Sequence, residues 1–364
     1  MSEREEDRIA RLRLIRSAQI GPVTYLHLMR RFGSAQAALD ALPSLAARGG
    51  GRAPRIAPRD RVEAEIAAVE AAGAHYLFLG QGLYPALLAE LDNAPPALIV
   101  RGDLKLLDRP TVAIVGARNA SAAACRFARM LAQELAEAGM LVVSGLARGI
   151  DTAAHQGALE RATAGVIASG IDIAFPPENA ALQEQVARQG VLIAEQPPGS
   201  EPLARHFPYR NRIIAGMALG TVVVEAAPRS GSLITARLAN EAGREVMAVP
   251  GSPLDPRAQG CNGLIRDGAT LIQSAADVME SLQPEGRVTV AEPQRPFARI
   301  AEPIEADDGQ RHAIVTLLSH APVPVDELVR QADLPPATVQ TVLLELELGG
   351  RLQRHAGARV SLTS

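Results

Sequence analysis

The chain has 364 residues, of which 47% are apolar and 21% charged, and its formal net charge is −3. This length corresponds to two or three domains, and the composition excludes a disordered chain or a long coiled coil. Two cysteines, Cys125 and Cys261, belong to no CxxC or Cys/His cluster, which argues against a disulfide framework and structural zinc. No stretch reaches the roughly 18 apolar residues of a membrane span. We therefore expect a cytoplasmic protein with no membrane contact.

The N-terminal segment, residues 1–72, carries apolar residues at helical spacing, interrupted at Gly21-Pro22 and Gly33-Ser34. This pattern predicts a small helical domain of the SAM-like type. The Gly21-Pro22 turn could present backbone amides to a phosphate or serve as a plain connector, and its function stays open. Residues 46–58, which include three consecutive glycines, predict a loop that does not pack.

Residues 73–282 form the expected core domain, and within it residues 111–273 alternate apolar runs of strand length with helical patterns. This alternation predicts an α/β fold with a Rossmann-like, doubly wound and mostly parallel sheet. The expected strands are 111–116, 141–145, 163–169, 190–195, 220–226, 245–250 and 269–273. The expected helices are 121–138, 151–161, 178–189, 210–218, 232–242 and 274–282. Residues 75–101 should add edge strands or a brace.

Residues 283–308 contain four prolines among mixed charges and read as a linker. Residues 309–364 then give three helical patterns and a strand-turn-strand, which predicts a winged-helix domain. We expect its helices at 309–319, at 324–332 and from Pro335-Pro336 to about 348, with the hairpin at 351–362.

The third helix of that domain has no Lys or Arg, and we expect its exposed residues to be Thr338, Thr341, Glu345 and Glu347. A recognition helix without cations repels phosphate. Leu344 and Leu348 extend its apolar surface. We therefore expect a protein-contact module or a structural remnant, not a duplex reader.

The loops at the carboxyl ends of the core strands are the expected binding region, because helix N-termini there present free N–H groups. After strand 111–116, the loop carries Gly116, Arg118 and Ser121, which suit an anion. Arg118 stands where a dinucleotide fingerprint needs its second glycine, which disfavours a nicotinamide-type cofactor.

The loop after the second core strand carries a second arginine among small residues, in the order Ser144, Gly145, Arg148, Gly149 and Asp151. Asp151 reads first as a helix cap, with a catalytic base or metal ligand as the alternative. His155 lies four residues later on the same helical face, but no third ligand is near in the sequence. We expect no metal.

Positive charge is concentrated between residues 201 and 237, a segment that contains five arginines and two glutamates. Just before an expected helix, Phe207, Arg210, Asn211 and Arg212 combine a ring, cations and an amide, the set that single-stranded nucleic acid needs. A GC-rich genome is the competing explanation for these arginines, since Lys105 is the only lysine among the 37 basic residues of the chain.

A further loop with anion-binding chemistry follows strand 220–226. It places hydroxyl groups around a glycine at another helix start. Its residues are Ser230, Gly231, Ser232 and Thr235.

Together these segments resemble the DNA-processing protein A family, also called DprA or Smf. The segments that match it in order are Tyr84-Pro85 with Leu88, Pro95-Pro96 with Gly102, Val112–Arg118, Ser144–Asp151, Phe207–Gly216, Ser230–Ala236 and Val249–Gly251. Ser169 and Phe175, in the third junction, depart mildly from the family, which often has Gly and Tyr there.

The resemblance implies a Rossmann-like core that binds single-stranded DNA, forms a homodimer and loads the RecA recombinase during natural transformation and recombination. Carried over by position, the phosphate contacts would be Arg118, Arg148, Arg210 and Arg212. Phe207 would be a stacking or wall residue, and the serines and glycines of the three loops would donate backbone amides. Asn211 and Asp151 would order the loops. No catalysis and no cofactor are implied.

Two other functions stay open. Related Rossmann-like cores resemble phosphoribohydrolases, which carry a Pro-Gly-Gly-x-Gly-Thr loop and a catalytic glutamate. This chain has Ala227-Pro-Arg-Ser-Gly-Ser232 in the comparable place, next to Glu225, so the tight glycine cradle is missing. A nucleotide sensor with the winged helix as output domain is the other alternative, and it predicts mononucleotide binding without length dependence.

Overall fold

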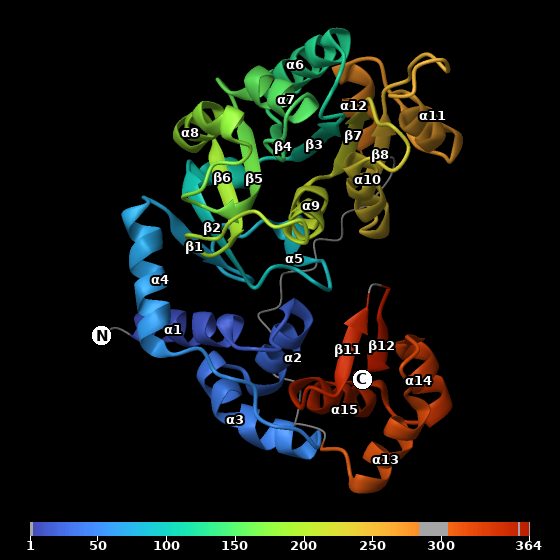
Figure 1. The fold of residues 1–364 in the computed structure, drawn as a ribbon. Helices are drawn as coiled ribbons and strands as arrows, with labels where there is room; N and C mark the ends of the chain where they lie inside the picture. The colour runs from blue at the N-terminus through green and yellow to red at the C-terminus, as the bar shows by residue number, and fades with distance from the viewer. Residues whose placement is uncertain (1–2, 284–304, 356, 364) are drawn as a thin grey trace. The chain divides into compact units, whose positions relative to one another are not determined.

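Residues 3–283, 305–355 and 357–363 are described by the computed structural model, and their contacts divide the chain into two units (Figure 1). One unit comprises residues 65–291, and the other joins residues 1–64 to residues 292–364. The expected linker at 283–308 falls almost entirely outside the described residues. The domain boundaries inferred from the sequence stay predictions.

The larger unit is built on one nine-stranded sheet in the order β1-β2-β6-β5-β4-β3-β7-β8-β9. The strands are β1 (His75–Phe78), β2 (Ala97–Gly102), β3 (Thr111–Gly116), β4 (Leu141–Ser144), β5 (Thr163–Gly170), β6 (Val191–Gln196), β7 (Gly220–Val224), β8 (Glu245–Ala248) and β9 (Thr270–Leu271). All pairs from β6 to β9 are parallel, whereas β2 pairs antiparallel with β6 and β1 adds an antiparallel edge strand beside β2. The expected Rossmann-like, mostly parallel sheet is confirmed.

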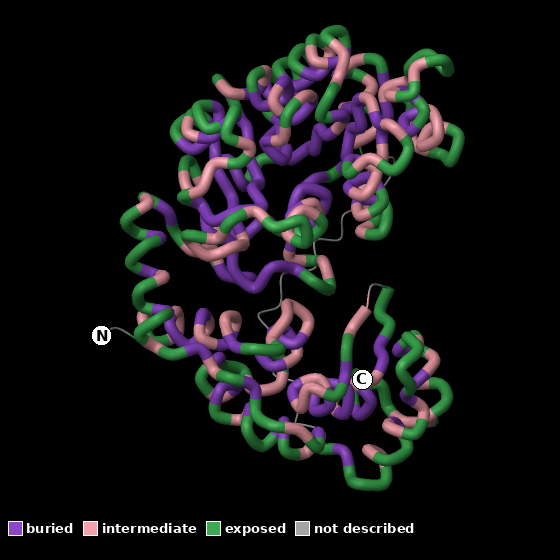
Figure 2. Tube along the Cα trace, in the orientation of Figure 1, coloured by how far each residue is buried: buried purple, intermediate pink, exposed green. Residues whose placement is uncertain are grey.

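The central strands are almost entirely buried because helices cover the sheet on both faces, as the buried stretches of Figure 2 show. The helices of this unit are α5 (Ala86–Ala89), α6 (Ala122–Glu137), α7 (Ile150–Ala158), α8 (Ala180–Gln189), α9 (His206–Met217), α10 (Gly231–Glu241), α11 (Gln259–Arg266) and α12 (Ala275–Leu282). Helices α6, α7 and α12 pack on one face of the sheet, and α9 packs beside α10.

The order of the strands places a switch point at β3. The chain builds outward from β3 through β4 and β5 to β6, and then returns to β7 on the other side of β3. In such sheets the loops after the two strands at the switch point diverge and leave a crevice for a ligand.

Helix α9 differs from the expectation in a way that matters for the site. It begins at His206, not at 210, so the Phe207–Arg212 segment lies in its first turns and not ahead of it. Successive residues of a helix point about 100° apart, so residues two apart face different surroundings.

The second unit contains the expected helical domain and winged-helix domain, and both are confirmed. The helical domain has α1 (Glu3–Arg16), α2 (Pro22–Phe32), α3 (Ala35–Arg48) and the start of α4 (Arg59–Ala71). The winged helix has α13 (Asp308–Leu317), β10 (Val323–Pro324), α14 (Val325–Ala332), α15 (Pro336–Leu348), β11 (Leu352–His355) and β12 (Arg359–Leu362).

Two expectations about this unit are wrong. Thr338 and Glu345 of α15, expected on the surface, are buried with exposures of 2% and 1%. The loop within residues 46–58 does pack: Ala57 is buried and its carbonyl accepts a hydrogen bond from Arg13 Nε at 3.1 Å. In both cases contacts with segments distant in the sequence override the local pattern.

No helix in the described part of the chain is long and apolar enough to cross a membrane.

Candidate functional site

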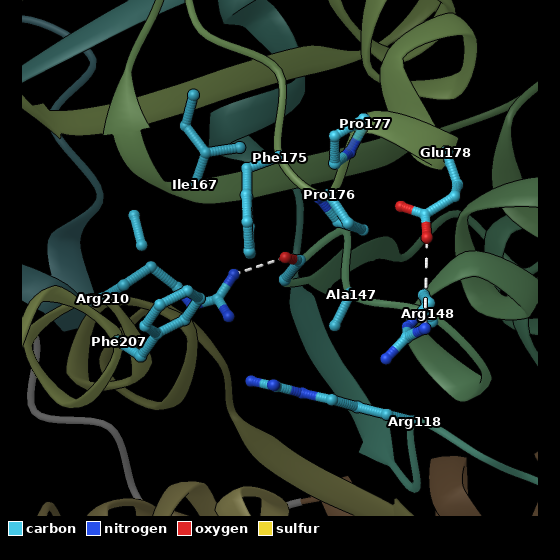
Figure 3. A pocket seen from close by; sticks show the side chains of 12 residues that line it. Arg118, Ala147, Arg148, Ile167, Phe175, Pro176, Pro177, Glu178, Phe207 and Arg210 are labelled. Carbon is cyan, nitrogen blue, oxygen red and sulfur yellow. Dashed lines mark hydrogen bonds and ion pairs between the residues drawn. The ribbon is translucent and has the colours of Figure 1, made fainter. Parts of the chain in front are cut away.

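A cavity of about 250 Å³ opens at the carboxyl ends of β4 and β5, beside the first turns of α9 (Figure 3). Its charged lining consists of three arginines and one glutamate, namely Arg118, Arg148, Arg210 and Glu178. The remaining lining residues are small or apolar: Gly145, Ala147, Ile167, Ala168, Phe175, Pro176, Pro177 and Phe207.

Two aromatic rings and an exposed guanidinium form one side of this cavity. Phe175 and Phe207 meet edge to face, with their ring centroids 5.8 Å apart. The guanidinium carbon of Arg118 lies 5.6 Å from the centroid of Phe207. Figure 3 shows the Arg118 side chain extending toward Phe207 from the loop after β3. A planar guanidinium beside aromatic rings suits a ligand that combines flat rings with negative charge.

Arg148 and Glu178 stand on the opposite side of the cavity. Arg148 Nη1 and Glu178 Oε1 are 4.0 Å apart, and both side chains are more than 60% exposed. An exposed pair at that distance contributes little to stability. Arg148 therefore remains available to an external anion, which would compete with Glu178.

Arg210 has a different position, because it is buried between the ends of two strands. The β4–β5 ladder ends at Ser144 and Gly165, and the carbonyls of Gly145 and Val166 beyond it both accept from Arg210 Nη1, the latter at 2.6 Å. The guanidinium thus satisfies buried carbonyls that the ladder leaves without a partner. Burial lowers the pKa of Arg210 to about 10, against the opposing effect of Asp151.

Gly145 is required by this arrangement. A Cβ built there would come within 2.3 Å of Arg210 Nη1, so only glycine leaves room for the guanidinium.

Asp151 holds the loop after β4 in shape. Its Oδ2 accepts the backbone N–H groups of Gly145 at 3.1 Å and Ala147 at 3.4 Å. Burial raises the pKa of Asp151, and Arg210 opposes that rise. Gly149 has φ +75°, and a Cβ there would meet the carbonyl oxygen of Ala117 at 2.2 Å. The loop after β4 is therefore held in one conformation, and the Asp151 carboxylate is used by hydrogen bonds within that loop.

At the switch point, the chain's own Glu225 links the loops after β3 and β7. Glu225, which follows β7 with φ +50°, accepts the Ser121 N–H at 2.8 Å and the Ser121 hydroxyl at 2.7 Å. Ser121 Oγ also accepts the N–H of Ala124 as the N-cap of α6. An internal anion thus occupies the helix N-terminus that the sequence suggested for a ligand.

Arg212 points away from the cavity, as a residue two positions from Arg210 on a helix must. Its side chain is 5% exposed, and its Nη2 pairs with Glu195 Oε1 at 2.5 Å. Its Nη1 donates to the carbonyl of Asn93. This arginine ties α9 to β6 and to the loop before β2.

The other residues expected at the site do not line the cavity. Ser144 is buried and donates to the carbonyl of Ile114 at 2.6 Å. Gly116 lets β3 approach β7, because a Cβ there would lie 1.9 Å from the carbonyl oxygen of Val224. The remaining ones lie on α9 or at the start of α10: Asn211, Ser230, Gly231, Ser232 and Thr235.

The α10 group is held by internal bonds. Ser230 Oγ and Ser232 Oγ are 2.7 Å apart, and Asn211 Nδ2 donates to the carbonyl of Gly231 at 3.5 Å. Asn211 Oδ1 accepts from Arg210 Nε at 3.0 Å. Of the expected site residues, the structure therefore brings five together around the cavity: Arg118, Gly145, Arg148, Phe207 and Arg210.

The site residues expected from the sequence leave out part of the cavity wall, namely the segment Phe175–Glu178 after β5, although Phe175 stands out in the sequence as a ring of the third junction. The available signal was its position at the carboxyl end of the third core strand, the same argument that selected the loops after β3 and β4. Among the residues that the structure describes, no three His, Cys, Asp or Glu side chains gather to hold a metal ion.

This fold and site define a class: a Rossmann-like protein with a basic, aromatic cavity at the strand ends, joined to a helical domain and a winged helix. Family models agree over most of the chain. DNA recombination-mediator protein A matches residues 75–283, a DprA-like N-terminal HHH domain matches 5–68, and the DprA winged helix domain matches 298–358. The chain belongs to the DprA family.

Individual relatives support this assignment. The chain is 45% identical to the DNA processing protein DprA of Streptococcus pneumoniae over 55% of this chain and 71% of that protein. It is 36% identical to the protein Smf of Escherichia coli over 84% of this chain and 82% of the relative.

Two solved structures share the fold. DNA processing protein A from S. pneumoniae matches with a TM-score of 0.58 and 40% identity, over 62% of this chain and 78% of that chain. DNA processing protein A from Helicobacter pylori matches with a TM-score of 0.53 and 29% identity, over 58% of this chain and 97% of that chain. The H. pylori work concerns that protein's single-stranded DNA binding mode.

Proposed function

We propose that this protein binds single-stranded DNA in the cavity beside α9. The observation that carries the proposal is the exposed guanidinium of Arg118 over the Phe207 ring, next to Phe175. Binding of single strands combines cations that follow the backbone with flat groups on which bases stack. Three guanidiniums against one carboxylate give the cavity a positive balance. The single-stranded DNA binding described for the H. pylori relative supports the same assignment.

Within the proposal, the arginines divide into two roles. Arg118 and Arg148 are exposed and contact phosphates. Arg210 is buried at the cavity and shapes its wall, whereas Arg212 is buried on another side of α9 and stabilises the fold. The serines at the start of α10 and at Ser121 are engaged within the chain, and their role is likewise to hold the loops.

We propose a binding function without catalysis. The phosphoribohydrolase alternative needs a free glutamate beside a glycine cradle, but Glu225 accepts two hydrogen bonds from Ser121. A carboxylate used as a helix partner is not poised as a general base.

We also propose, from membership of the family, that the protein forms a homodimer and delivers the bound strand to the RecA recombinase in transformation and recombination. Light scattering of the full chain tests the dimer. Stimulation of RecA filament assembly on protein-coated strands tests delivery, and a chain that binds DNA without stimulating RecA would reject delivery alone.

The binding proposal is tested by fluorescence anisotropy of a labelled oligo-dT series at two salt concentrations. We expect Arg118→Ala and Arg148→Ala each to weaken binding and to reduce the log–log salt slope by about 0.7, the value per phosphate neutralised on single strands. Arg188→Ala is the matched control, because Arg188 is an exposed arginine of α8 that pairs with Glu184.

Unlabelled duplex and mononucleotide serve as competitors. Length-dependent, salt-sensitive binding that Arg118→Ala weakens and Arg188→Ala retains would support the proposal. Full competition by a mononucleotide would contradict it and favour the nucleotide sensor.

A further inference from the structure

Helix α15 is covered from Thr338 to its end, with only Pro336 and Ala337 exposed, although it is the third helix of a winged-helix domain. From Thr338 to Leu348, every residue of this helix is buried or half-buried. In winged-helix and helix-turn-helix proteins that read duplex DNA, the corresponding helix presents a free face to the major groove. The described residues of α15 leave no such face over that stretch.

The cover comes from two sides. Val339, Val342 and Leu343 pack in the core of the winged helix. Leu344 and Leu348 instead complete the core of the N-terminal helical domain, together with residues of α3 such as Leu45. One helix therefore contributes to two hydrophobic cores whose sequences are almost 300 residues apart.

The backbones also approach closely at this seam. A Cβ on Gly49, just after α3, would lie 1.9 Å from the carbonyl oxygen of Glu345, and a Cβ on Gly51 would lie 1.9 Å from that of Gly349. Gly49 has φ −71° and ψ 0°, a conformation that any residue adopts. Its space is therefore limited by the winged helix and not by its own backbone.

A buried carboxylate links the two domains at the same place. Glu345 is 1% exposed and pairs with Arg48 of α3 at 3.1 Å and with Arg311 of α13 at 2.9 Å. Arg351 Nη1 adds a hydrogen bond to the carbonyl of Gly49 at 3.3 Å. Removal of Glu345 would leave Arg48 and Arg311 with only their exposed partners, Glu305 and Asp308, so the buried carboxylate holds both sides of the seam.

We propose that α15 is a protein-docking helix whose partner is α3 of the same chain, and that the helical and winged-helix domains fold and open as one module. The helix is thereby closed to duplex DNA. The proposal concerns the unit apart from the cavity, so it stands or falls independently of single-stranded DNA binding.

Hydrogen exchange of the full-length protein, followed by mass spectrometry, tests the proposal with the variant Gly49→Ala. In an undocked helical domain the methyl group would no longer meet Glu345 and Leu346, which are its nearest neighbours here, and it would favour the helical backbone. In the docked module it acts as a wedge against Glu345, so we expect amides of 336–348 to exchange at least about tenfold faster, equivalent to about 1.4 kcal/mol of opening free energy. Gly263→Ala, at a helical glycine with open space, is the control.

A second pair of variants gives the test from the other side. Glu345→Gln keeps the side-chain shape and removes the charge, and we expect faster exchange over residues 35–48 of the helical domain. Glu347→Gln, on the same helix, breaks only the pair with Arg354 of the winged helix and should leave residues 35–48 unchanged. If Gly49→Ala does not yield folded protein, this pair carries the test.

Two results would overturn the proposal. One is unchanged exchange over 336–348 in Gly49→Ala together with unchanged exchange over 35–48 in Glu345→Gln. The other is protection of 338–348 when a duplex oligonucleotide is added to the parent protein, because the docked helix offers it no surface over that stretch.

Discussion

The substitution Arg212→Ala distinguishes a structural arginine from a DNA contact. Sequence reasoning placed Arg212 with Arg210 among the phosphate contacts. The structure instead pairs Arg212 with Glu195 and with the carbonyl of Asn93, on the side of α9 away from the cavity. We therefore expect this variant to lose stability and to keep its single-stranded DNA affinity.

The expected loss follows from the burial of the pair. Breaking a buried ion pair by removing one partner costs roughly 3–5 kcal/mol, because the other charge stays behind. The Glu195 side chain is 20% exposed, so water can reach it and the cost falls at the lower end, about 3 kcal/mol. For a unit the size of residues 65–291 this corresponds to a melting temperature lower by about 6–12 °C.

Urea unfolding and oligo-dT anisotropy, measured on the same preparations, test this expectation. Binding is compared at a temperature where both proteins are folded, with Arg118→Ala as the reverse case: unchanged unfolding midpoint and weakened binding. An Arg212→Ala protein with an unchanged midpoint and lost affinity would refute the reasoning and return Arg212 to the phosphate contacts.

Three further expectations concern single groups of the larger unit. Glu178→Gln should raise single-stranded DNA affinity about twofold to fivefold in anisotropy titrations, because it removes the exposed competitor of Arg148. Burial lowers the pKa of His155 to about 3. Below pH 6.5, His155 therefore binds a proton in the unfolded chain but stays neutral in the folded chain. Stability should therefore fall with decreasing pH between 6.5 and 3, by up to about 1.4 kcal/mol per pH unit from this group, and urea midpoints of His155→Leu should lack that component. Ser121→Ala should lower the free energy of unfolding by about 1–2 kcal/mol through the lost cap and the lost bond to Glu225, with unchanged DNA affinity. A stable variant with weakened binding would instead place Ser121 at the DNA.

Much of the fold follows from local sequence patterns. Apolar runs of strand length alternate with helical periods, and a parallel sheet that is covered on both faces is the arrangement that buries them. The same logic located the loops after β3 and β4, and with them Arg118 and Arg148, because strand ends and helix starts can be recognised from nearby glycines and small residues. The third helix of the winged helix and its excess of apolar residues were also visible in the sequence.

The partners of the side chains were decided by the tertiary structure. Arg210 and Arg212 look alike in sequence. Because α9 begins at His206, both lie within the helix and their side chains point in different directions. Arg210 reaches the carbonyls at the ends of β4 and β5, and Arg212 reaches Glu195. The N–H of Ser121, at the start of α6, donates to the carboxylate of Glu225, which lies 104 residues away in the sequence. The sequence predicts that Glu345 lies on the surface, but in the structure it is buried and pairs with Arg48 of α3. Local pattern determines which elements form and with which period, because it depends on neighbours within a few residues. Burial and pairing depend on which distant segments pack together, and no local pattern contains that information.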